Sequence, residues 1–314
     1  MKELRSIYKY SKNMGAIMSF TIKQLSQAGA SEVNGLDVRD PIGIEDMARL
    51  REAFNNSPIM CIRNQHASPK EQANFSRQWG PLEKQGKSDY CHPDDADILI
   101  LSNERRSDGS QVGIVDAGDF WHSDSSHMEE PCKITMLLSV KNPDKGGDTH
   151  FINLCQAYES MPEALKARIS GRNAIHHSSK TLNPRVTIST ERANETEYYK
   201  SAEKTKKPVI QPMVRTHPNT GRQALYISPR FTIGIDGMDD AEAQPLLDDL
   251  FRHMFSNTAW QYTHKWKDGD LVFWDNACLN HMAGGGYEYP DTRRMHRTTI
   301  AGERAFYQPL PDKK

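Results

Sequence analysis

The sequence lacks the features that mark membrane proteins and charge-driven nucleic-acid binders. No apolar run approaches the roughly 18 residues that a membrane span needs, and the mean hydropathy is −0.73. Neither sign of charge is in excess, because 40 Lys and Arg face 41 Asp and Glu, for a net charge of −1. A balanced charge argues against broad electrostatic binding of nucleic acid. We therefore expect neither a membrane nor a nucleic acid as a partner.

Cysteine is scarce, and its spacing excludes two kinds of structural staple. The chain has five cysteines in 314 residues, and no two of them form a C-x-x-C pair. This number and spacing argue against a disulfide framework or a structural zinc site, and favour a reducing, cytoplasmic compartment. A chain of this length buries enough surface to fold without either staple.

Nucleotide-binding signatures are also missing, since no G-x-G-x-x-G follows a strand and no Walker A pattern occurs. The chain instead has many short runs rich in Ile, Val, Leu or Thr, most of them bounded by Gly, Pro, Asn or Asp. This pattern predicts strands at 59–64, 98–102, 134–140, 149–154, 209–215, 224–228, 270–274 and 294–300. Many short strands with few helices favour a mainly β sandwich or jelly-roll barrel over a doubly wound parallel sheet.

Four helical segments are expected beside these strands. The first follows Asp40 and has apolar residues every three or four positions, which predicts one buried face made of Ile44, Met47, Leu50 and Phe54. The second begins with a capping box at 68–71, has Pro at its first position, and should run to about Trp79. The others lie near 155–170, ending at Gly171, and at 239–255.

We expect one domain over residues 18–314, preceded by a loose N-terminal extension at 1–17. Within the domain, the stretch 180–208 is polar and charged and has no strong periodicity. A loop this long in a compact fold is typically functional or a solvated insertion. We interpret it as an active-site lid, with the solvated insertion as the alternative.

The strongest chemical signal is the sequence Trp121-His122-Ser123-Asp124. On an extended strand, residues two apart point to the same side, so His122 and Asp124 would present an imidazole and a carboxylate together. These are two of the three ligands of a 2-His-1-carboxylate site for Fe(II). Such a tripeptide is common by chance, and a third ligand has to come from elsewhere. His281, just past an apolar strand, is the candidate.

A second signal is the arginine-rich strand at 293–297. Alternation places Arg293, Met295 and Arg297 on one face, and Arg294 and His296 on the other. A buried arginine needs an anion, and a guanidinium binds a carboxylate through two parallel hydrogen bonds. One face could thus hold a dicarboxylate at Arg293 and a second anion at Arg297. The alternative is ordinary surface charge on an edge strand.

Taken in order, H-x-D at 122–124, G-G-D-T at 146–149, W-D-N-x₄-H at 274–281 and R-R-M-H-R at 293–297 resemble the TauD/TfdA family. Members of that family are Fe(II)- and 2-oxoglutarate-dependent dioxygenases with a double-stranded β-helix core, a jelly roll of the cupin-like type. The resemblance runs from about Gly29 to Phe306. It implies an enzyme that uses Fe(II), 2-oxoglutarate and O₂ and releases succinate and CO₂.

The resemblance also implies a role for each matched position. The iron ligands would be His122, Asp124 and His281. The 2-oxoglutarate ligands would be Thr149 and Arg293, although a glycine-rich segment before Arg293 leaves Arg294 as an alternative. The anionic group of the primary substrate would meet Arg297. Further pocket positions, matched more loosely, are Phe231, His92, Thr181 and Leu182.

These roles imply a small anionic organic substrate such as an aryloxyalkanoate or other carboxylate, a sulfonate, a sulfate or a phosphonate. Halogenating relatives carry Gly or Ala in place of the carboxylate ligand, so Asp124 favours hydroxylation. A biosynthetic hydroxylation, desaturation or ring closure of a natural-product acid is the alternative. Other classes to weigh are a non-catalytic 2-oxoglutarate sensor and a metal-dependent hydrolase or cupin-like isomerase. The family also suggests a homo-oligomer, either a dimer or a tetramer.

Overall fold

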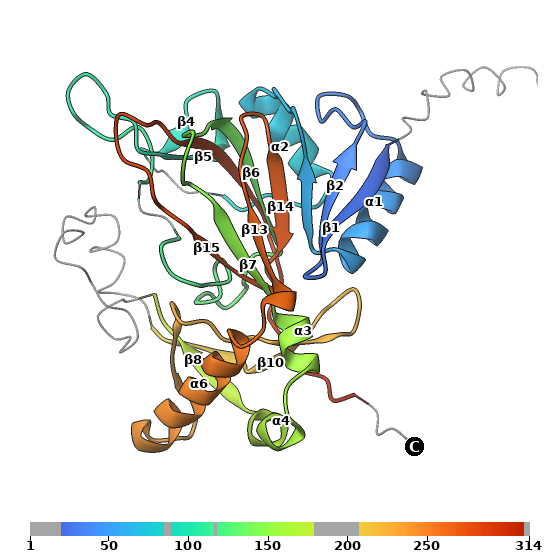
Figure 1. Cartoon of the computed structure of the whole chain (residues 1–314), viewed down its shortest axis with the longest axis vertical. Helices are drawn as coiled ribbons and strands as arrows, with labels where there is room; N and C mark the ends of the chain where they lie inside the picture. The colour runs from blue at the N-terminus through green and yellow to red at the C-terminus, as the bar shows by residue number, and fades with distance from the viewer. Residues whose placement is uncertain (1–19, 85–88, 116–117, 179–206, 311–314) are drawn as a thin grey trace, which may run out of the picture.

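The computed structural model describes residues 20–84, 89–115, 118–178 and 207–310 (Figure 1). The expected N-terminal extension at 1–17 lies outside the described residues. So does the candidate lid at 180–208, apart from its last two positions.

The largest sheet has eight strands in the order β1-β2-β3-β14-β6-β16-β5-β4. Neighbours pair antiparallel except β2 and β3, which are parallel. The strands span Thr21–Ser26 (β1), Ala30–Asn34 (β2), Ile59–Ile62 (β3), Leu271–Asp275 (β14), Ile134–Lys141 (β6), Arg294–Ile300 (β16), Asp95–Ser102 (β5) and Cys91–His92 (β4).

A second sheet faces the first and consists of β13 (Gln261–His264), β7 (Thr149–Asn153) and β15 (Leu279–Ala283), in the order β13-β7-β15. The two sheets meet through large side chains, since the ring of Phe151 on β7 lies 5.5 Å from that of Trp274 on β14. Two facing antiparallel sheets with long connections form the jelly-roll core that the strand pattern predicted.

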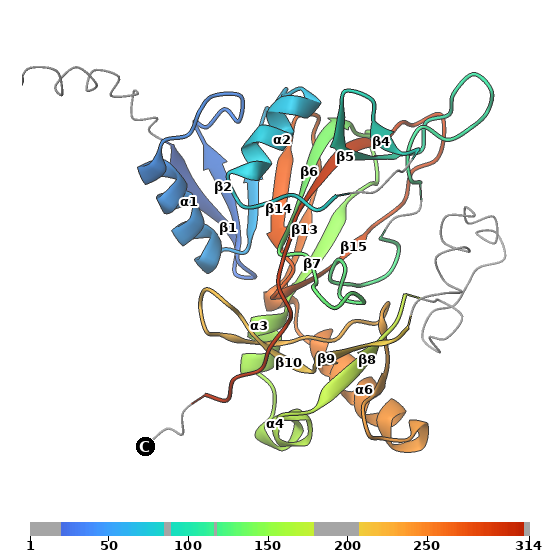
Figure 2. The ribbon, with the colours of Figure 1, turned by 180° about the vertical axis from the view of Figure 1, so that it is seen from behind.

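A smaller layer lies below these sheets (Figures 1 and 2). It contains a three-stranded sheet, a two-stranded hairpin and helices. The sheet is β12 (Thr232–Ile235), β8 (Asn173–His176) and β9 (Val209–Pro212), and the hairpin is β10 (Val214–Thr216) with β11 (Gln223–Leu225). The helical elements are α3 (Leu154–Glu159), α4 (Glu163–Ile169), α6 (Asp240–Met254) and the 3₁₀ turn η2 (Thr258–Trp260).

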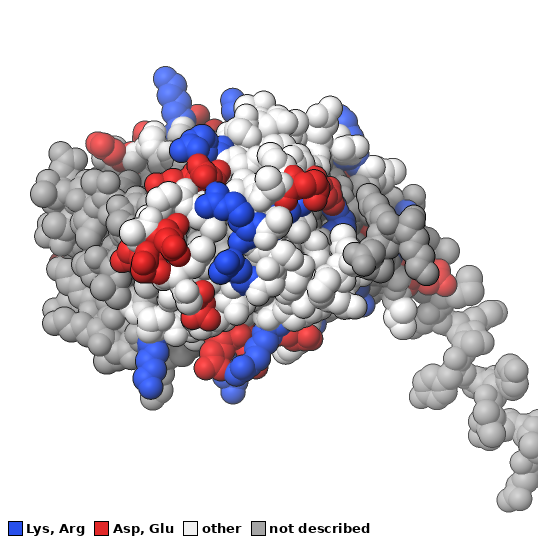
Figure 3. Space-filling model, turned by 90° about the horizontal axis from the view of Figure 1, so that it is seen from below, with Lys and Arg blue, Asp and Glu red and all other residues white. Residues whose placement is uncertain are grey.

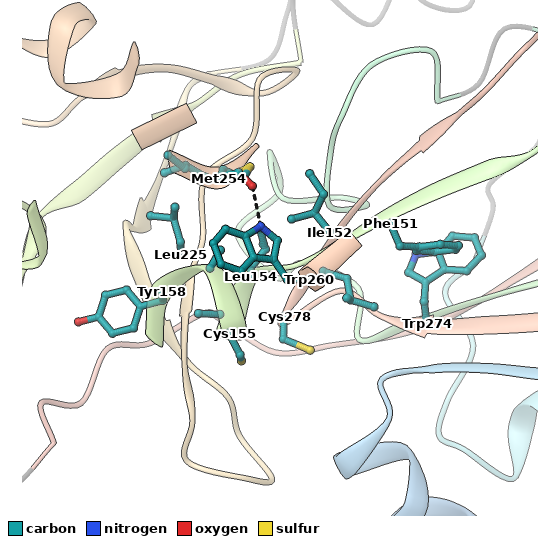
Figure 4. Close-up of a cluster of buried hydrophobic side chains, with 14 of the residues drawn as sticks. Phe151, Ile152, Leu154, Cys155, Tyr158, Leu225, Met254, Trp260, Trp274 and Cys278 are labelled. Atoms are coloured by element: carbon teal, nitrogen blue, oxygen red, sulfur yellow. Dashed lines mark hydrogen bonds between the residues drawn. The ribbon is translucent and has the colours of Figure 1, made fainter. Parts of the chain in front are cut away.

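Alternation along β14 divides the apolar interior into two clusters. Val272 and Trp274 belong to the inner cluster between the sheets, whereas Leu271 and Phe273 belong to an outer cluster. A strand buried on both faces needs apolar side chains at every position, which explains the uninterrupted run at 270–274. Figure 4 shows part of the inner cluster, where the indole N–H of Trp260 donates a hydrogen bond to the Met254 carbonyl at 2.8 Å.

Helices α1 (Ile44–Asn56) and α2 (Pro69–Arg77) cover the outer face of the large sheet. The capping box predicted at Ser68 and Glu71 is confirmed, with both reciprocal hydrogen bonds present. The predicted buried face of α1 is correct at Met47, Leu50 and Phe54 but wrong at Ile44, which is 90% exposed. The helix begins at Ile44, so this side chain lies in the first turn and stays outside the contact with the sheet.

All predicted strands are present, but some boundaries differ. The run at 209–215 divides into β9 and β10, and the helix expected near 155–170 divides into α3 and α4, with Pro162 as the N-cap of α4. The sequence pattern did not predict seven of the strands: β1, β2, β4, β8, β12, β13 and β15. Within the described residues, no helix is both long and apolar enough to cross a membrane.

The outer cluster predicts a large stability effect at Phe273. Its ring lies 5.3 Å from Phe54, 6.3 Å from Phe75 and 5.0 Å from Trp79. Replacing Phe273 with Ala should therefore lower the free energy of unfolding by about 3–5 kcal/mol, measured by urea denaturation. Ile44→Ala is the control and should change it by less than about 0.5 kcal/mol. Equal effects of the two substitutions would contradict the packing described.

Candidate active site

A short backbone pairing brings the two histidines of the predicted metal site together. The N–H of His122 donates to the His281 carbonyl at 3.0 Å, and the N–H of His281 donates back to the His122 carbonyl at 2.8 Å. This isolated bridge joins the segment around His122 to β15. The two imidazole rings consequently lie with their centroids 4.2 Å apart, and Asp124 follows two residues after His122.

The three side chains present one ligand atom each within a small volume. His122 Nε2 lies 3.3 Å from Asp124 Oδ1, and His281 Nε2 lies 3.6 Å from Asp124 Oδ2. A ligand atom from each of the three residues lies within 4.8 Å of the other two, and all three residues are buried. The Nδ1 of His122 lies 2.7 Å from the Phe120 carbonyl. A Nδ1–H donated there leaves the Nε2 lone pair for a metal.

Burial and neighbouring charges keep Asp124 and His281 in the protonation states that can bind a metal. Burial opposes ionisation of Asp124, but Arg297 and the two histidines hold the pKa of its carboxyl well below its usual range. Burial and the neighbouring His122 lower the pKa of His281 to about 3. Asp124 is thus a carboxylate and His281 a neutral imidazole near pH 7. Two imidazoles and one carboxylate are the donor set that suits Fe(II) with open coordination positions.

Thr149 and Arg293 line the same pocket as the three candidate ligands. Arg293 is only 7% exposed, and its Nε has no hydrogen-bond partner among the described residues. The Thr149 hydroxyl oxygen accepts a hydrogen bond from the Trp266 indole at 2.9 Å, which leaves the hydroxyl hydrogen available as a donor. A buried guanidinium N–H without an acceptor, beside a hydroxyl donor, fits a carboxylate such as that of 2-oxoglutarate.

Two glycines near Thr149 and Arg293 are required because another backbone segment or side chain lies too close for a larger residue. The glycine-rich segment after β15 runs against the G-G-D-T turn, with the Gly147 N–H donating to the Gly285 carbonyl at 2.7 Å. A Cβ on Gly146, whose φ is +77°, would lie 2.3 Å from the Gly286 carbonyl oxygen. A Cβ on Gly147 would approach Arg293 to 3.3 Å. The segment between His281 and Arg293 therefore shapes the wall beside the guanidinium.

Strand β16 places its arginines as the alternation predicted. Arg297 lines the pocket together with Arg293, and its Nη2 lies 3.3 Å from Asp124 Oδ2. Its Nε donates to the Thr299 hydroxyl at 3.2 Å. Arg294 instead lies 3.4 Å from Glu104 and does not line this pocket. The geometry thus favours Arg293 over Arg294 as the partner of a dicarboxylate.

The structure places the more loosely matched pocket residues differently. The ring of Phe231 lies 5.8 Å from that of His122, beside the candidate metal ligands. The structure does not bring His92 to the pocket: its ring packs 4.9 Å from His296, which lies on the opposite face of β16 from Arg297. The sequence could not show this, because its pattern did not predict the short strand β4 that carries His92. Thr181 and Leu182 lie outside the described residues.

Three residues of the site were missed by the sequence analysis. Thr135 lines the pocket, and its hydroxyl contacts the Asp124 carboxylate. The Asn276 amide hydrogen-bonds to the Asp124 backbone and to the Thr135 hydroxyl. The Trp266 indole hydrogen-bonds to Thr149. Alternation along the predicted strand at 134–140 could have placed Thr135 on the same face as Leu137, which also lines the pocket. No sequence signal identifies the partner that Asn276 or Trp266 would have.

Two other buried groups of His, Cys and Asp occur among the described residues. In the first, Asp270 Oδ2 already lies 2.5 Å from Arg63 Nη1 and 3.1 Å from His264 Nε2. In the second, Asp275 is engaged by His217 at 3.0 Å and by the Ala277 N–H at 2.8 Å. Neither of these groups lines the pocket that holds His122, Asp124 and His281, so the group around Asp124 is the best candidate for a metal site.

Comparison with known proteins agrees with this geometry. The family model described as "Taurine catabolism dioxygenase TauD, TfdA family" matches residues 21–299. The chain belongs to this family.

Among curated relatives, an alpha-ketoglutarate-dependent 2,4-dichlorophenoxyacetate dioxygenase of Cupriavidus pinatubonensis is 31% identical, covering 90% of this chain and 98% of the relative. Pentalenolactone F synthase of Streptomyces arenae is 28% identical, covering 86% and 90%.

Solved structures of the family superpose closely. AAD-2 in complex with Mn(II) and N-oxalylglycine is 28% identical, with a TM-score of 0.72 over 92% of this chain and 99% of that chain. A taurine dioxygenase from Burkholderia xenovorans has a TM-score of 0.73 at 24% identity, over 92% of this chain and 97% of that chain. The jelly-roll fold, the family and the enzyme class expected from the sequence are confirmed.

The position of His296 generates a prediction about acid stability. Burial, with His92 and Arg294 nearby, lowers the pKa of His296 to about 4. An unfolded histidine titrates near 6.5, so between pH 6.5 and 4 only the unfolded state takes up this proton, and stability falls as the pH falls. The contribution lost between pH 7 and pH 5 is about 2 kcal/mol.

Urea unfolding of wild type and of His296→Gln at pH 7 and pH 5 measures this contribution. The variant should lose less stability on acidification than wild type does. Identical losses in the two proteins would show that His296 is not held neutral in the folded state.

Proposed function

We propose that this dioxygenase uses Fe(II), 2-oxoglutarate and O₂ to hydroxylate a small anionic organic substrate, with release of succinate and CO₂. In this proposal His122, Asp124 and His281 hold the metal. Thr149 and Arg293 hold the far carboxylate of 2-oxoglutarate, and Arg297 meets the anionic group of the substrate. A non-catalytic sensor would not need the complete set of metal ligands next to two arginines, and a hydrolase or isomerase would not need the arginines.

The observation that carries the proposal is the charge of one pocket. Arg297 on β16 and Arg293, the residue just before β16, line this pocket, and Asp124 is its acidic lining residue. Two guanidinium groups against one carboxylate leave one positive charge, and a divalent iron would add two. The dianion 2-oxoglutarate would remove two of these, so one positive charge would remain for the substrate. Electrostatic complementarity therefore favours a substrate anion.

The chain positions the reactants, while the bound iron and 2-oxoglutarate supply the oxidative chemistry. Arg293 and Thr149 fix one end of the cosubstrate, and Arg297 fixes one end of the substrate next to Asp124. Orientation of this kind accounts for a large part of catalysis, because the reacting groups are held together in advance. Phe231 adds an aromatic ring beside His122.

The proposed substrate class is a carboxylate with an apolar body, such as an aryloxyalkanoate. Its support is the apolar lining of the pocket by Leu101, Leu137 and Ala283, together with relatives named as 2,4-dichlorophenoxyacetate and phenoxypropionate dioxygenases. A biosynthetic reaction on a natural-product acid is the second candidate, favoured by the similarity to pentalenolactone F synthase.

The partners and location expected from the sequence stay predictions, as does the division into an extension at 1–17 and one domain at 18–314. We propose a cytoplasmic homo-oligomer without a nucleic-acid or membrane partner. Figure 3 supports the absence of broad charge-driven binding on one face, where acidic and basic side chains are interspersed over the part of the chain that is described.

Succinate formation tests the proposed reaction. With Fe(II), ascorbate and 2-oxoglutarate, one member of a panel of aryloxy acids, aliphatic acids, sulfonates, sulfates and phosphonates should stimulate O₂-dependent succinate release. His122→Ala should lose this activity, because it removes a metal ligand. If wild type with bound iron forms no succinate with or without any panel member, the dioxygenase proposal is wrong.

Two arginine substitutions separate cosubstrate binding from substrate binding. Arg293→Gln should weaken 2-oxoglutarate binding, and Arg297→Gln should raise the KM for the anionic substrate with little effect on 2-oxoglutarate. Each loss removes a charge-assisted hydrogen bond, so a change of about 10- to 100-fold is expected. Isothermal titration with 2-oxoglutarate and steady-state kinetics measure the two effects. The opposite pairing of variant and effect would reverse the assigned roles.

A further inference from the structure

Thr135 lies beside the candidate metal ligands and is fully buried. It comes from β6, where alternation points Thr135 and Leu137 into the pocket between the sheets. Its hydroxyl lies 2.7 Å from Asp124 Oδ2, closer than Arg297 or either histidine lies to that carboxylate. A contact this short to an ionised oxygen is a charge-assisted hydrogen bond.

The direction of this hydrogen bond is fixed by Asn276. The Asn276 amide nitrogen lies 3.0 Å from the Thr135 hydroxyl oxygen and can only donate. The Thr135 oxygen therefore accepts from Asn276, and its own hydrogen is directed to Asp124. The amide oxygen of Asn276 in turn accepts from the Asp124 backbone N–H and the Trp274 indole, both at 3.2 Å. In this arrangement the amide nitrogen of Asn276 acts as a donor and its amide oxygen as an acceptor.

The two oxygens of Asp124 have different surroundings as a result. Oδ2 faces the Thr135 hydroxyl at 2.7 Å, the Arg297 guanidinium at 3.3 Å and, farther away at 3.6 Å, His281 Nε2. Oδ1 faces His122 Nε2 at 3.3 Å. Each oxygen thus has an imidazole nitrogen nearby, but Oδ2 also faces the Thr135 hydroxyl and the Arg297 guanidinium. Oδ1 is therefore the oxygen better placed to bind a metal together with His122.

We propose that Thr135 is a positioning residue that, oriented by Asn276, makes Asp124 a metal ligand through Oδ1 alone. This inference rests on the metal site of the proposed function. A carboxylate that bound the metal through both oxygens would occupy a coordination position that the cosubstrates need. Hydrogen bonds from neighbouring side chains orient metal ligands in this way, and their loss typically weakens metal binding by about 10- to 100-fold.

The test is metal affinity in the absence of 2-oxoglutarate, measured by anaerobic titration of the full-length protein with Mn(II) or Co(II). Thr135→Val keeps the size of the side chain and removes the hydroxyl, so binding should weaken by about 10- to 100-fold. Thr135→Ser keeps the hydroxyl and should bind within about 2-fold of wild type, since it retains the hydrogen bond to Asp124. Near-UV circular dichroism and the urea midpoint check that each variant is folded. Thr135→Ala replaces the valine variant if that one fails to fold.

Thr298→Val is the matched control. Thr298 is equally buried, and its hydroxyl lies 2.7 Å from Ser76 Oγ on the opposite face of β16. Thr298→Val should lower the stability to a similar extent as Thr135→Val and leave the metal affinity unchanged. Unchanged affinity in Thr135→Val, or equal weakening in Thr298→Val, would overturn the role of Thr135. If wild type and His122→Ala bind the metal equally weakly, the metal site itself is wrong, which is a separate failure.

Discussion

The candidate site depends on the pair of backbone hydrogen bonds between His122 and His281. These residues are far apart in the sequence, and the bridge holds a loop segment against β15. Because both partners of the bridge are also candidate ligands, the backbone itself sets the spacing of the two imidazoles. Asp124 then reaches the same point two residues later. Further hydrogen bonds orient groups that the backbone has already brought together: the Phe120 carbonyl and the Asn276 amide oxygen accept them, and the Thr135 hydroxyl donates one.

The same strands serve stability and chemistry through their two faces. Arg297 on β16 and Arg293 just before it point into the pocket, while Thr298 and Ile300 of β16 face α2 and the outer cluster. Buried charge on the inner face is costly without partners, and the packed outer face offsets that cost. The rigid sheet fixes the distance between the two anion-binding groups, which suits a site that has to hold two small anions in a set orientation.

Local patterns predicted the fold class and the ligand set, but not the contacts around them. The capping box at Ser68 and the alternation at Arg293 and Arg297 depend on neighbours along the chain, so the sequence revealed them. The position of His92 against His296, and of Asn276 between Asp124 and Thr135, depends on pairings between strands distant in the sequence. Strands such as β13 and β15 were missed because they have mixed polar residues, and their partners in the sheet stabilise them.

A crystal structure with Mn(II) and N-oxalylglycine would test the central claim most directly. We expect the metal on His122 Nε2, Asp124 Oδ1 and His281 Nε2, with the far carboxylate of the analogue on Arg293 and Thr149. A metal at another group, such as His217 with Asp275, or an analogue carboxylate bound to Arg294, would contradict it.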